Sequence, residues 1–464
     1  MVSAILRDRC ALAIILLTIV GLILRLYRID ANSIWLDEAV TYHISLQSIP
    51  DIWNSIGTGE PNPPLFYWAE HFMLSLGNSE LILRLIPAIS GTLTIPLLFF
   101  VGRLLLDRYA GVIAAALLTI SPFHILHSQD ARVFSLLLLV SCVALIFYLK
   151  GISSWSLRSW ILFGIFSAVA FWLHFYVIIF VATLFLSALC LNLYENKGFN
   201  KFKPLIASLA LFLAISLPLI FQFLYSVDLK LMEGSFGLRG LGFAGAAVWE
   251  YLGPGVLEMI PFLLFFAIGY YYFFKTDRRR FTLISLVLTI PFVISCLLSE
   301  VIAMYPRYLI FLMPIFLVVV AASYKPLLAL RGPKLVYAFV LILVSVNAIT
   351  LSSYYSSPSF QDWKGITPIV QNMTADQDIV AVVPGWMALP FDYYYSHEED
   401  HTREFGASSS AELDSILSLK GNSSIIILLT EDINVQDPSG VLAWIGQNAI
   451  FERNHTGISI YLVR

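Results

Sequence analysis

Two adjacent carboxylates, Asp37 and Glu38, stand in the segment SIWLDEAVTYHIS, shortly after the first long apolar stretch of the chain. A carboxylate within hydrogen-bond reach of a hydroxyl can remove its proton, so the pair has the chemistry of a general base. Neighbouring residues of a helix point about 100° apart, so only one of the two would face a reacting group. We expect that residue to be Asp37, with Glu38 turned toward a supporting partner. The alternative is a solvated helix cap, a common role for a carboxylate at the end of a span.

A second polar group lies in SPFHILHSQDARVF, between two apolar stretches, and contains His124, His127, Gln129, Asp130 and Arg132. Polar side chains at membrane depth are costly unless they serve a function. His124, His127 and Asp130 are three positions apart, so on a helix they would share one face. Two imidazoles and a carboxylate can bind zinc, so a divalent cation is one interpretation. Histidines hydrogen-bonded at the membrane interface are the other.

Two further segments place polar side chains beside apolar runs. His174 stands in WLHFYV without a charge nearby, as an interfacial histidine would. The segment EVIAMYPRYLIF brings Tyr305, Arg307 and Tyr308 to the outer end of a span. Arginine suits a lipid-linked phosphate because it can donate two hydrogen bonds at once and keeps its charge. It could equally extend its side chain to the interface.

Composition fixes the class of protein that must position these residues. The chain has 464 residues, of which 58% are hydrophobic and 13% charged, with a net charge of −3. Such a composition does not fit one soluble core, and it predicts a polytopic α-helical membrane protein. The small net charge gives no indication of a nucleic-acid partner.

A spanning helix needs roughly 20 mainly apolar residues, and the sequence offers such stretches repeatedly. We predict about eleven transmembrane helices. Their ranges are 9–28, 81–102, 110–126, 133–149, 159–173, 175–194, 204–224, 246–274, 281–299, 308–323 and 335–352.

Basic residues set the expected orientation, because Lys and Arg accumulate in cytoplasmic loops. More than half of the 28 Lys and Arg residues fall on one face when the N-terminus is placed inside. The loop 29–80 and the chain after 352 would then be extracytoplasmic, in a plasma (inner) membrane protein. The first span leads on without a small-residue cleavage site, so we expect a retained anchor.

After Leu351 the apolar pattern ends and polar residues return. Short β-branched runs, DIVAVVP and SSIIILLT, alternate with segments of helical periodicity. We therefore predict two domains: a transmembrane domain, 1–352, whose loop 29–80 carries the active site, and a small extracytoplasmic α/β domain, 353–464.

With these residues in view, the chain resembles membrane glycosyltransferases of the GT-C class that use polyprenyl-phosphate sugars. This group, glycosyltransferase family 39 among them, includes protein O-mannosyltransferases and the aminoarabinose transferase of lipid A. The segments that carry the resemblance run from about residue 20 to 370 and are LDEAVTY, PNPPLFYW, HSQDARVFSLLLL, HFYV, PRYLIFLMP and SFQDWKGI. Many relatives have His before the Pro-Pro pair where this chain has Asn62, which puts a role for that position in doubt.

The resemblance implies transfer of a sugar from a polyprenyl-phosphate donor to an acceptor hydroxyl of a lipid, glycan or protein. Asp37 would be the base, and a single displacement would invert the anomeric carbon. The implied roles are catalytic for Asp37, Glu38 and Asp130; donor phosphate binding for Arg132, Arg307, Tyr308 and Arg84; substrate binding for Tyr42, His43, Asn62 and His174; and binding of a divalent metal cation for His124, His127 and Asp130.

Two other functions stay open. A lipid-linked glycan transferase or ligase would move a whole glycan, although the tail lacks the Trp-Trp-Asp segment of one such type. A transporter or flippase would use the carboxylates only to bind cargo. Transporters concentrate ionisable groups near the bilayer midplane, whereas this chain has them at one face, which favours the transferase.

Overall fold

The computed structural model describes residues 8–56, 60, 62–194, 202–233, 238–253, 255–357, 361–375, 377–395, 403–430 and 439–463. Pro61, Ser359 and Phe360, which belong to the motifs above, lie outside these residues. The chain forms two compact units, each taken by itself here. The first comprises Met1–Tyr27, Ser48–Met73 and Arg84–Tyr355, and the second comprises Arg28–Gln47, Leu74–Leu83 and Ser356–Arg464. The second unit thus contains parts of the predicted loop 29–80 as well as the tail.

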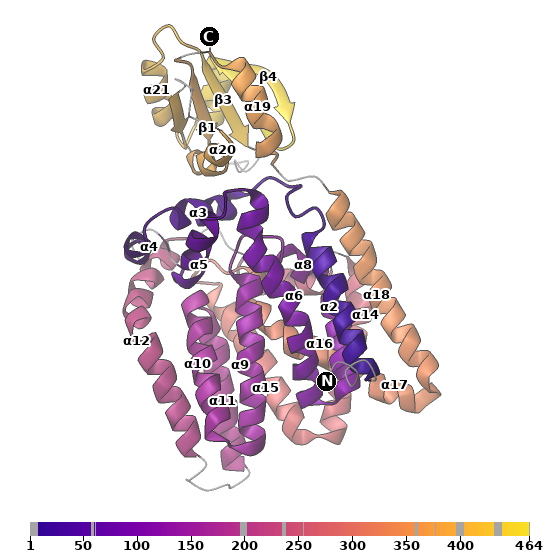
Figure 1. Cartoon of the computed structure of the whole chain (residues 1–464). Coiled ribbons are helices and arrows are strands. Elements are labelled where there is room, and N and C mark those ends of the chain that lie inside the picture. The colour runs from indigo at the N-terminus through magenta and orange to yellow at the C-terminus, as the bar shows by residue number, and fades with distance from the viewer. Residues whose placement is uncertain are drawn as a thin grey trace. The chain divides into compact units, whose positions relative to one another are not determined.

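The first unit is a bundle of helices (Figure 1). Its elements, some of which end in the second unit, are α2 (Arg9–Leu26), α4 (Ile49–Ser55), α5 (Leu65–Leu74), α6 (Glu80–Leu105), α7 (Arg108–Thr119), α8 (Pro122–Leu126), α9 (Phe134–Ser154), α10 (Leu157–Leu173), α11 (Val177–Tyr194), α12 (Phe202–Glu233), α13 (Gly240–Leu252), α14 (Val256–Thr276), α15 (Arg278–Leu298), η2 (Pro306–Leu312), α16 (Met313–Ala322), α17 (Tyr324–Arg331) and α18 (Pro333–Ser356).

The described residues contain eight segments long and apolar enough to cross a membrane: α2, α6, α9, Phe202–Gln222, α14, α15, Pro306–Arg331 and α18. Three shorter apolar helices, Arg108–Thr119, Leu157–Leu173 and Val177–Leu193, accompany them. These eight and three segments match the predicted spans one for one. The predicted polytopic helical fold is therefore confirmed.

Two predicted spans are wrong in extent. The span 110–126 ends as α7 at Thr119, and α8 begins separately at Pro122 after Ser121, whose side chain accepts from the His124 N–H. The span 246–274 is divided at Gly253, whose φ of 115° favours glycine, into α13 and α14. Both breaks bring polar residues to the end of the bundle that carries the candidate site.

Burial within the first unit separates core from periphery. Of the 18 residues in an apolar stretch of Pro306–Arg331, 89% are buried, against 17% in such a stretch of α2 and 22% in one of α18. Apolar side chains on the outer helices, such as Ile23 and Leu341, are exposed. Lipid contact accounts for this exposure, because the bilayer is the solvent of these surfaces.

The second unit is an α/β domain, as predicted for the tail. Its strands are β1 (Ile379–Val383), β2 (Arg403–Gly406), β3 (Ile425–Thr430), β4 (Ile450–His455) and β5 (Ile458–Val463), in the order β2-β1-β3-β5-β4. β1 runs parallel to β2 and β3, with Val380 opposite Ile426, whereas β5 is antiparallel to β3 and β4.

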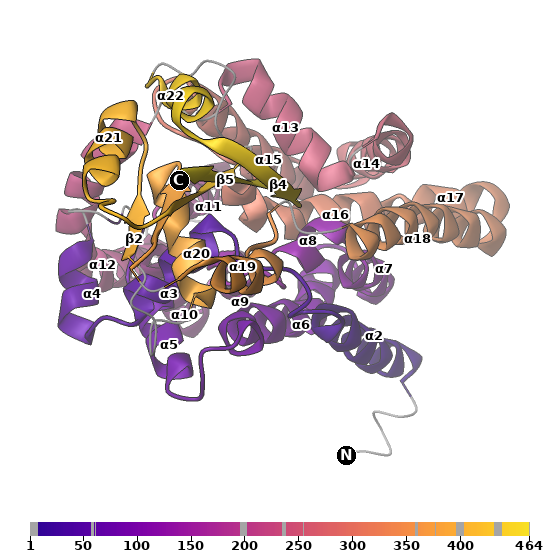
Figure 2. The same ribbon diagram turned by 90° about the horizontal axis from the view of Figure 1, so that it is seen from above.

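Successive side chains of a strand point to opposite faces of the sheet, and helices cover both faces here. Val380 and Val382 pack with α19 (Trp363–Met373) and α20 (Ala388–Tyr394), while Ile379 and Ala381 pack with α21 (Ser410–Ser418) and α22 (Val441–Asn448). Figure 2 shows the two helix pairs on opposite sides of the strands. A short helix, η3 (Gly385–Met387), follows β1, and α3 (Leu36–Ser45) packs beside α20.

Candidate active site

Asp37 and Glu38 lie in the first turn of α3, in the second unit. Glu38 is 1% exposed, and its Oε2 accepts a hydrogen bond from the Trp35 N–H at 3.3 Å. It therefore satisfies one of the free N–H groups at the start of the helix. Asp37 is only partly buried, and its carbonyl accepts from the Thr41 hydroxyl at 3.0 Å. The two carboxylates have different surroundings, because one caps the helix and the other remains accessible.

The aromatic residues of α3 pack on α20. The Tyr42 ring meets the Tyr393 ring edge to face at 4.8 Å. His43 Nε2 lies 3.2 Å from the Leu389 carbonyl oxygen and 3.6 Å from Asp392 Oδ2. The structure thus gives Tyr42 and His43 packing and hydrogen-bonding partners within the second unit.

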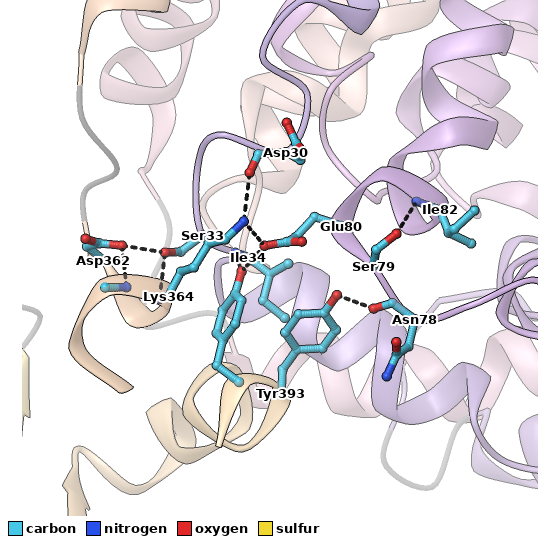
Figure 3. Close-up of polar contacts among 12 residues, drawn as sticks. Asp30, Ser33, Ile34, Asn78, Ser79, Glu80, Ile82, Asp362, Lys364 and Tyr393 are labelled. Carbon is cyan, nitrogen blue, oxygen red and sulfur yellow. Dashed lines mark hydrogen bonds and ion pairs between the residues drawn. The ribbon is translucent and has the colours of Figure 1, made fainter. Parts of the chain in front are cut away.

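A polar network fixes the segment that precedes α3 (Figure 3). Lys364 Nζ lies 2.8 Å from Glu80 Oε1 and donates to the Asp30 carbonyl oxygen at 3.1 Å. The Ser33 hydroxyl donates to Asp362 Oδ1 at 3.0 Å and accepts from the Lys364 N–H at the same distance. Asp362 and Lys364 come from QDWKGI, so this motif positions the segment that leads into Asp37.

Asp362 is held in its ionised form. Burial alone would raise its pKa, but hydrogen bonds from the Gly365 N–H, His455 and Ser33 outweigh burial and lower the pKa below its ordinary value. His455 Nε2 lies 3.0 Å from Asp362 Oδ2. The network therefore keeps an anionic acceptor at neutral pH.

In the first unit, His124 is fixed by a buried arginine. Arg25 Nη2 lies 2.7 Å from His124 Nδ1, and both side chains are fully buried. The same guanidinium donates to the carbonyl oxygens of Leu118, Thr119 and Gly21 at 3.2, 3.3 and 2.9 Å. Burial, and next the charge of Arg25, hold the pKa of His124 well below its ordinary value. His124 is consequently a neutral hydrogen-bond acceptor for Arg25.

His127 and Asp130 form the polar end of the same segment. His127 Nδ1 is 3.9 Å from Asp130 Oδ2, and both residues are buried. Burial lowers the pKa of His127, and Asp130 partly offsets that shift. His127 Nε2 has no hydrogen-bond partner among the described residues. Gln129 Nε2 donates to the Tyr27 carbonyl oxygen at 2.8 Å, which joins the segment to the end of α2.

The predicted metal set is not assembled. No group of three His, Cys, Asp or Glu side chains in the described part of the chain is placed to hold a metal ion. The predicted three-residue row required one helix, but α8 ends at Leu126, and His124 directs Nδ1 to Arg25 instead of toward Asp130.

A cavity of about 370 Å³ lies at this end of the first unit. His127, Glu250, Tyr251, Tyr305 and Arg307 contribute polar or aromatic groups to its lining. Arg307 packs over the Tyr305 and Phe134 rings, with its Cζ 4.6 and 5.5 Å from their centroids. Burial raises the pKa of Glu250, and the charge of Arg307 opposes that shift. The cavity combines the Arg307 cation with a carboxyl group whose pKa is raised.

A second cavity, of about 350 Å³, shares two of these lining residues, Tyr251 and Leu252. The rest of its lining is almost entirely apolar: Ala247, Val248, Leu263, Phe266, Leu288, Thr289, Phe292, Leu309, Leu312 and Phe316. Tyr251 lines both cavities, and its hydroxyl has no hydrogen-bond partner within the described residues. Together the cavities suit a molecule with an anionic head and a long apolar tail.

Tyr308 and His174 belong to an aromatic cluster beside the cavity. The Tyr308 ring lies 4.9 Å from that of His174 and 4.8 Å from that of Tyr176. His174 is 1% exposed, and its Nδ1 accepts from the Tyr176 N–H at 3.3 Å. Neither Tyr308 nor His174 lines the cavity, so their binding roles stay predictions.

The remaining predicted residues lie apart from the cavity lining. Arg84 is buried in α6, and Arg132 is partly buried, its N–H donating to the Asp130 carbonyl oxygen at 2.6 Å. Asn62 donates from its N–H to Glu60 Oε1 at 2.8 Å and from Nδ2 to the same oxygen. The roles predicted for Arg84, Arg132 and Asn62 stay predictions.

Two polar residues were missed by the sequence argument. Arg25 resembles any basic residue at the end of a span, and Glu250 stands inside an apolar run that was assigned to one helix. A signal for Glu250 was present in WEYLGPG, where two glycines and a proline predict a break beside a carboxylate. Nothing in the sequence indicates the partner of Arg25, because His124 is 99 positions away.

Comparisons with known proteins give a match to one family model and likeness in fold to several solved structures. The family model described as Dolichyl-phosphate-mannose-protein mannosyltransferase matches residues 61–221. A search of curated proteins returned no significant match. The family match covers α5 to most of α12, and it confirms there the resemblance to glycosyltransferases of the GT-C class.

Solved structures extend the likeness to nearly the whole chain as a fold. ArnT from Cupriavidus metallidurans bound to undecaprenyl phosphate is 14% identical, with 97% of this chain and 98% of that chain covered and a TM-score of 0.63. The oligosaccharyltransferase AglB from Archaeoglobus fulgidus, in complex with an inhibitory peptide and a dolichol-phosphate, is 11% identical over 99% of this chain and 74% of its own, with a TM-score of 0.56. The arabinofuranosyltransferase AftD from Mycobacteria is 14% identical, with 97% of this chain and 40% of that chain covered and a TM-score of 0.53.

Proposed function

We propose that this chain, whose fold resembles those of GT-C glycosyltransferases, transfers one sugar from a polyprenyl-phosphate donor to an acceptor hydroxyl. The observation that carries the proposal is the pair of neighbouring cavities that share Tyr251 and Leu252 in their linings. One is lined by Arg307 and His127, and the other by apolar side chains, which matches a phosphate head followed by a prenyl chain. The lipid phosphates in the ArnT and AglB structures belong to those proteins and support the same class of donor here.

Arg307 would hold the donor phosphate. Its guanidinium can donate two hydrogen bonds to phosphate oxygens and keeps its charge throughout. The Tyr251 hydroxyl and His127 Nε2, both without partners in the described residues, are available as further donors to the head group. As the bond between the anomeric carbon and the phosphate oxygen breaks, negative charge grows on that oxygen, and Arg307 would stabilise it.

Asp37 would act as the base. The acceptor hydroxyl gives its proton to the Asp37 carboxylate while its oxygen forms the new bond to the anomeric carbon. The polyprenyl phosphate leaves with the electron pair of the broken bond. One displacement inverts the anomeric configuration, as in single-step glycosidases. Glu38, which caps α3, would orient Asp37 through the helix.

The test is a transfer assay with the full chain in liposomes. A panel of radiolabelled polyprenyl-phosphate sugars is offered, with membranes as the source of acceptor, with and without a chelator. Transfer of a single sugar would support the proposal, and the chelator reports whether a divalent cation takes part. Transfer of only lipid-linked oligosaccharides would favour the glycan ligase, and donor movement across the bilayer without transfer would favour the flippase.

A further inference from the structure

A third cavity lies away from the candidate active site, between α14 and α17. It has a volume of about 470 Å³ and is lined by Ala267, Ile268, Tyr271, Tyr272, Lys275 and Pro326. The five residues of α14 follow the spacing of one helix face, so the cavity is a groove along that helix. The groove is lined by apolar and aromatic side chains along α14, and the Lys275 ammonium group lies near the end of that helix.

Lys275 has no carboxylate partner among the described residues. Its Nζ lies 5.5 Å from the centroid of the Tyr271 ring and 6.0 Å from that of Phe274. Two carboxylates near this end are already paired. Asp107 Oδ2 is 2.7 Å from Lys325 Nζ, and Asp277 Oδ2 is 3.4 Å from Arg280 Nη1.

The same end of the first unit is rich in further positive charge. Arg278 packs on the Phe274 ring at 3.9 Å, and Arg331 and Lys334 stand where α17 and α18 meet. A groove with apolar walls and an uncompensated cation at its mouth is complementary to a lipid whose head is anionic. A zwitterionic head group is less favourable, because its positive charge would be repelled by Lys275.

We infer that the groove between α14 and α17 binds an anionic phospholipid of the surrounding leaflet, with the acyl chain along Ala267 and Ile268 and the phosphate at Lys275. The tyrosine rings at positions 271 and 272 border the head group, as aromatic side chains do at membrane interfaces. This site is separate from the cavities assigned to the donor lipid and does not depend on the proposed transferase activity.

Native mass spectrometry of the full chain in neutral detergent tests the inference. Phosphatidylglycerol and phosphatidylcholine with the same acyl chains are titrated against the wild type and three variants. Lys275→Gln removes the cation, Lys334→Gln removes an exposed cation outside the groove, and Ala267→Phe fills the groove. All three positions are exposed, so the fold should be retained.

The wild type should retain phosphatidylglycerol in preference to phosphatidylcholine. Lys275→Gln should lower that retention about fivefold, the effect expected for one lysine beside an anionic head. Ala267→Phe should lower the retention of both lipids, and Lys334→Gln should leave it unchanged. Equal losses in the two lysine variants would indicate only a general surface field and overturn the site. Equal retention of the two lipids by the wild type, or no effect of Ala267→Phe, would also overturn it.

Discussion

Arg25 Nη2 lies 2.7 Å from His124 Nδ1, and neither residue is exposed. An arginine can only donate, so Nδ1 of His124 must carry a lone pair, and the proton of the neutral ring resides on Nε2. Protonation of the imidazole would place two cations in contact in a buried position. The pair therefore fixes one tautomer of His124 and ties α2 to the segment that contains His127 and Asp130.

Replacing Arg25 should destabilise the first unit. In Arg25→Gln the shorter side chain leaves the Leu118 and Thr119 carbonyls and His124 Nδ1 without their donor. We expect the free energy of unfolding to fall by about 3 kcal/mol, the upper range for hydrogen bonds to a charged group. Thermal unfolding in detergent measures the change, with Arg9→Gln, an exposed site on the same helix, as control. Equal stability of the two variants would contradict the structural role of Arg25.

Glu38 should act through its hydrogen bond and not through its charge. Glu38→Gln keeps an oxygen that can accept from the Trp35 N–H, whereas Glu38→Ala leaves that group without its cap. The alanine variant should lose about 1 kcal/mol of stability, as capping substitutions do. The glutamine variant should stay close to the wild type in thermal unfolding and in transfer rate. A glutamine variant as impaired as the alanine variant would assign the function of Glu38 to its charge.

Donor binding should depend on Arg307. Removal of its hydrogen bonds to a phosphate in Arg307→Ala should weaken binding of a polyprenyl-phosphate sugar roughly 10- to 100-fold. Arg239→Ala serves as the matched control because Arg239 is exposed at the start of α13 and does not line the cavity. Equilibrium binding of radiolabelled donor to each variant in detergent measures the two affinities. Equal donor affinity in the two variants would remove Arg307 from the phosphate site.

Glu250 should make donor binding depend on pH. Its pKa is raised above the ordinary value of 4.5, so the side chain is neutral below the raised pKa and anionic above it. An anionic Glu250 repels a phosphate in the same cavity, so donor affinity should fall as the pH rises through that pKa. A phosphodiester donor is the right probe, because it does not have the second ionisation near pH 6 of a phosphate monoester. Glu250→Gln should abolish the pH dependence and keep the higher affinity. An unchanged pH profile in this variant would show that another group titrates.

The order of the apolar helices could be predicted because each is an apolar run, and a spanning helix requires about 20 such residues. The breaks could not. Both breaks fall inside sequence runs that remain largely apolar. The first lies between Thr119 and Pro122, where Ser121 caps the next helix, and the second lies at Gly253, which has a positive φ. Those two breaks decide where His124 and Glu250 lie, so His124, His127 and Asp130 do not share the one helix expected of them, and Glu250 was missed.

The sequence could indicate Arg307 and His127 as candidate site residues, because both stand in polar segments at the ends of apolar runs. Roles for Tyr308 and His174 were harder to separate from packing, since an aromatic cluster and a binding site share the same residue types. Contacts over long separations, such as Arg25 with His124 or Ser33 with Asp362, leave no local pattern. Only the folded chain reveals them.

The most direct test of the account is sugar transfer by Asp37→Asn in liposomes, with the donor that the wild type accepts. The substitution removes the base and almost no volume, so donor binding and thermal unfolding should match the wild type while transfer is lost. Asp51→Asn, an exposed carboxylate at the start of α4, is the control and should transfer normally. Transfer by Asp37→Asn at the wild-type rate would contradict the assignment of Asp37 as the base.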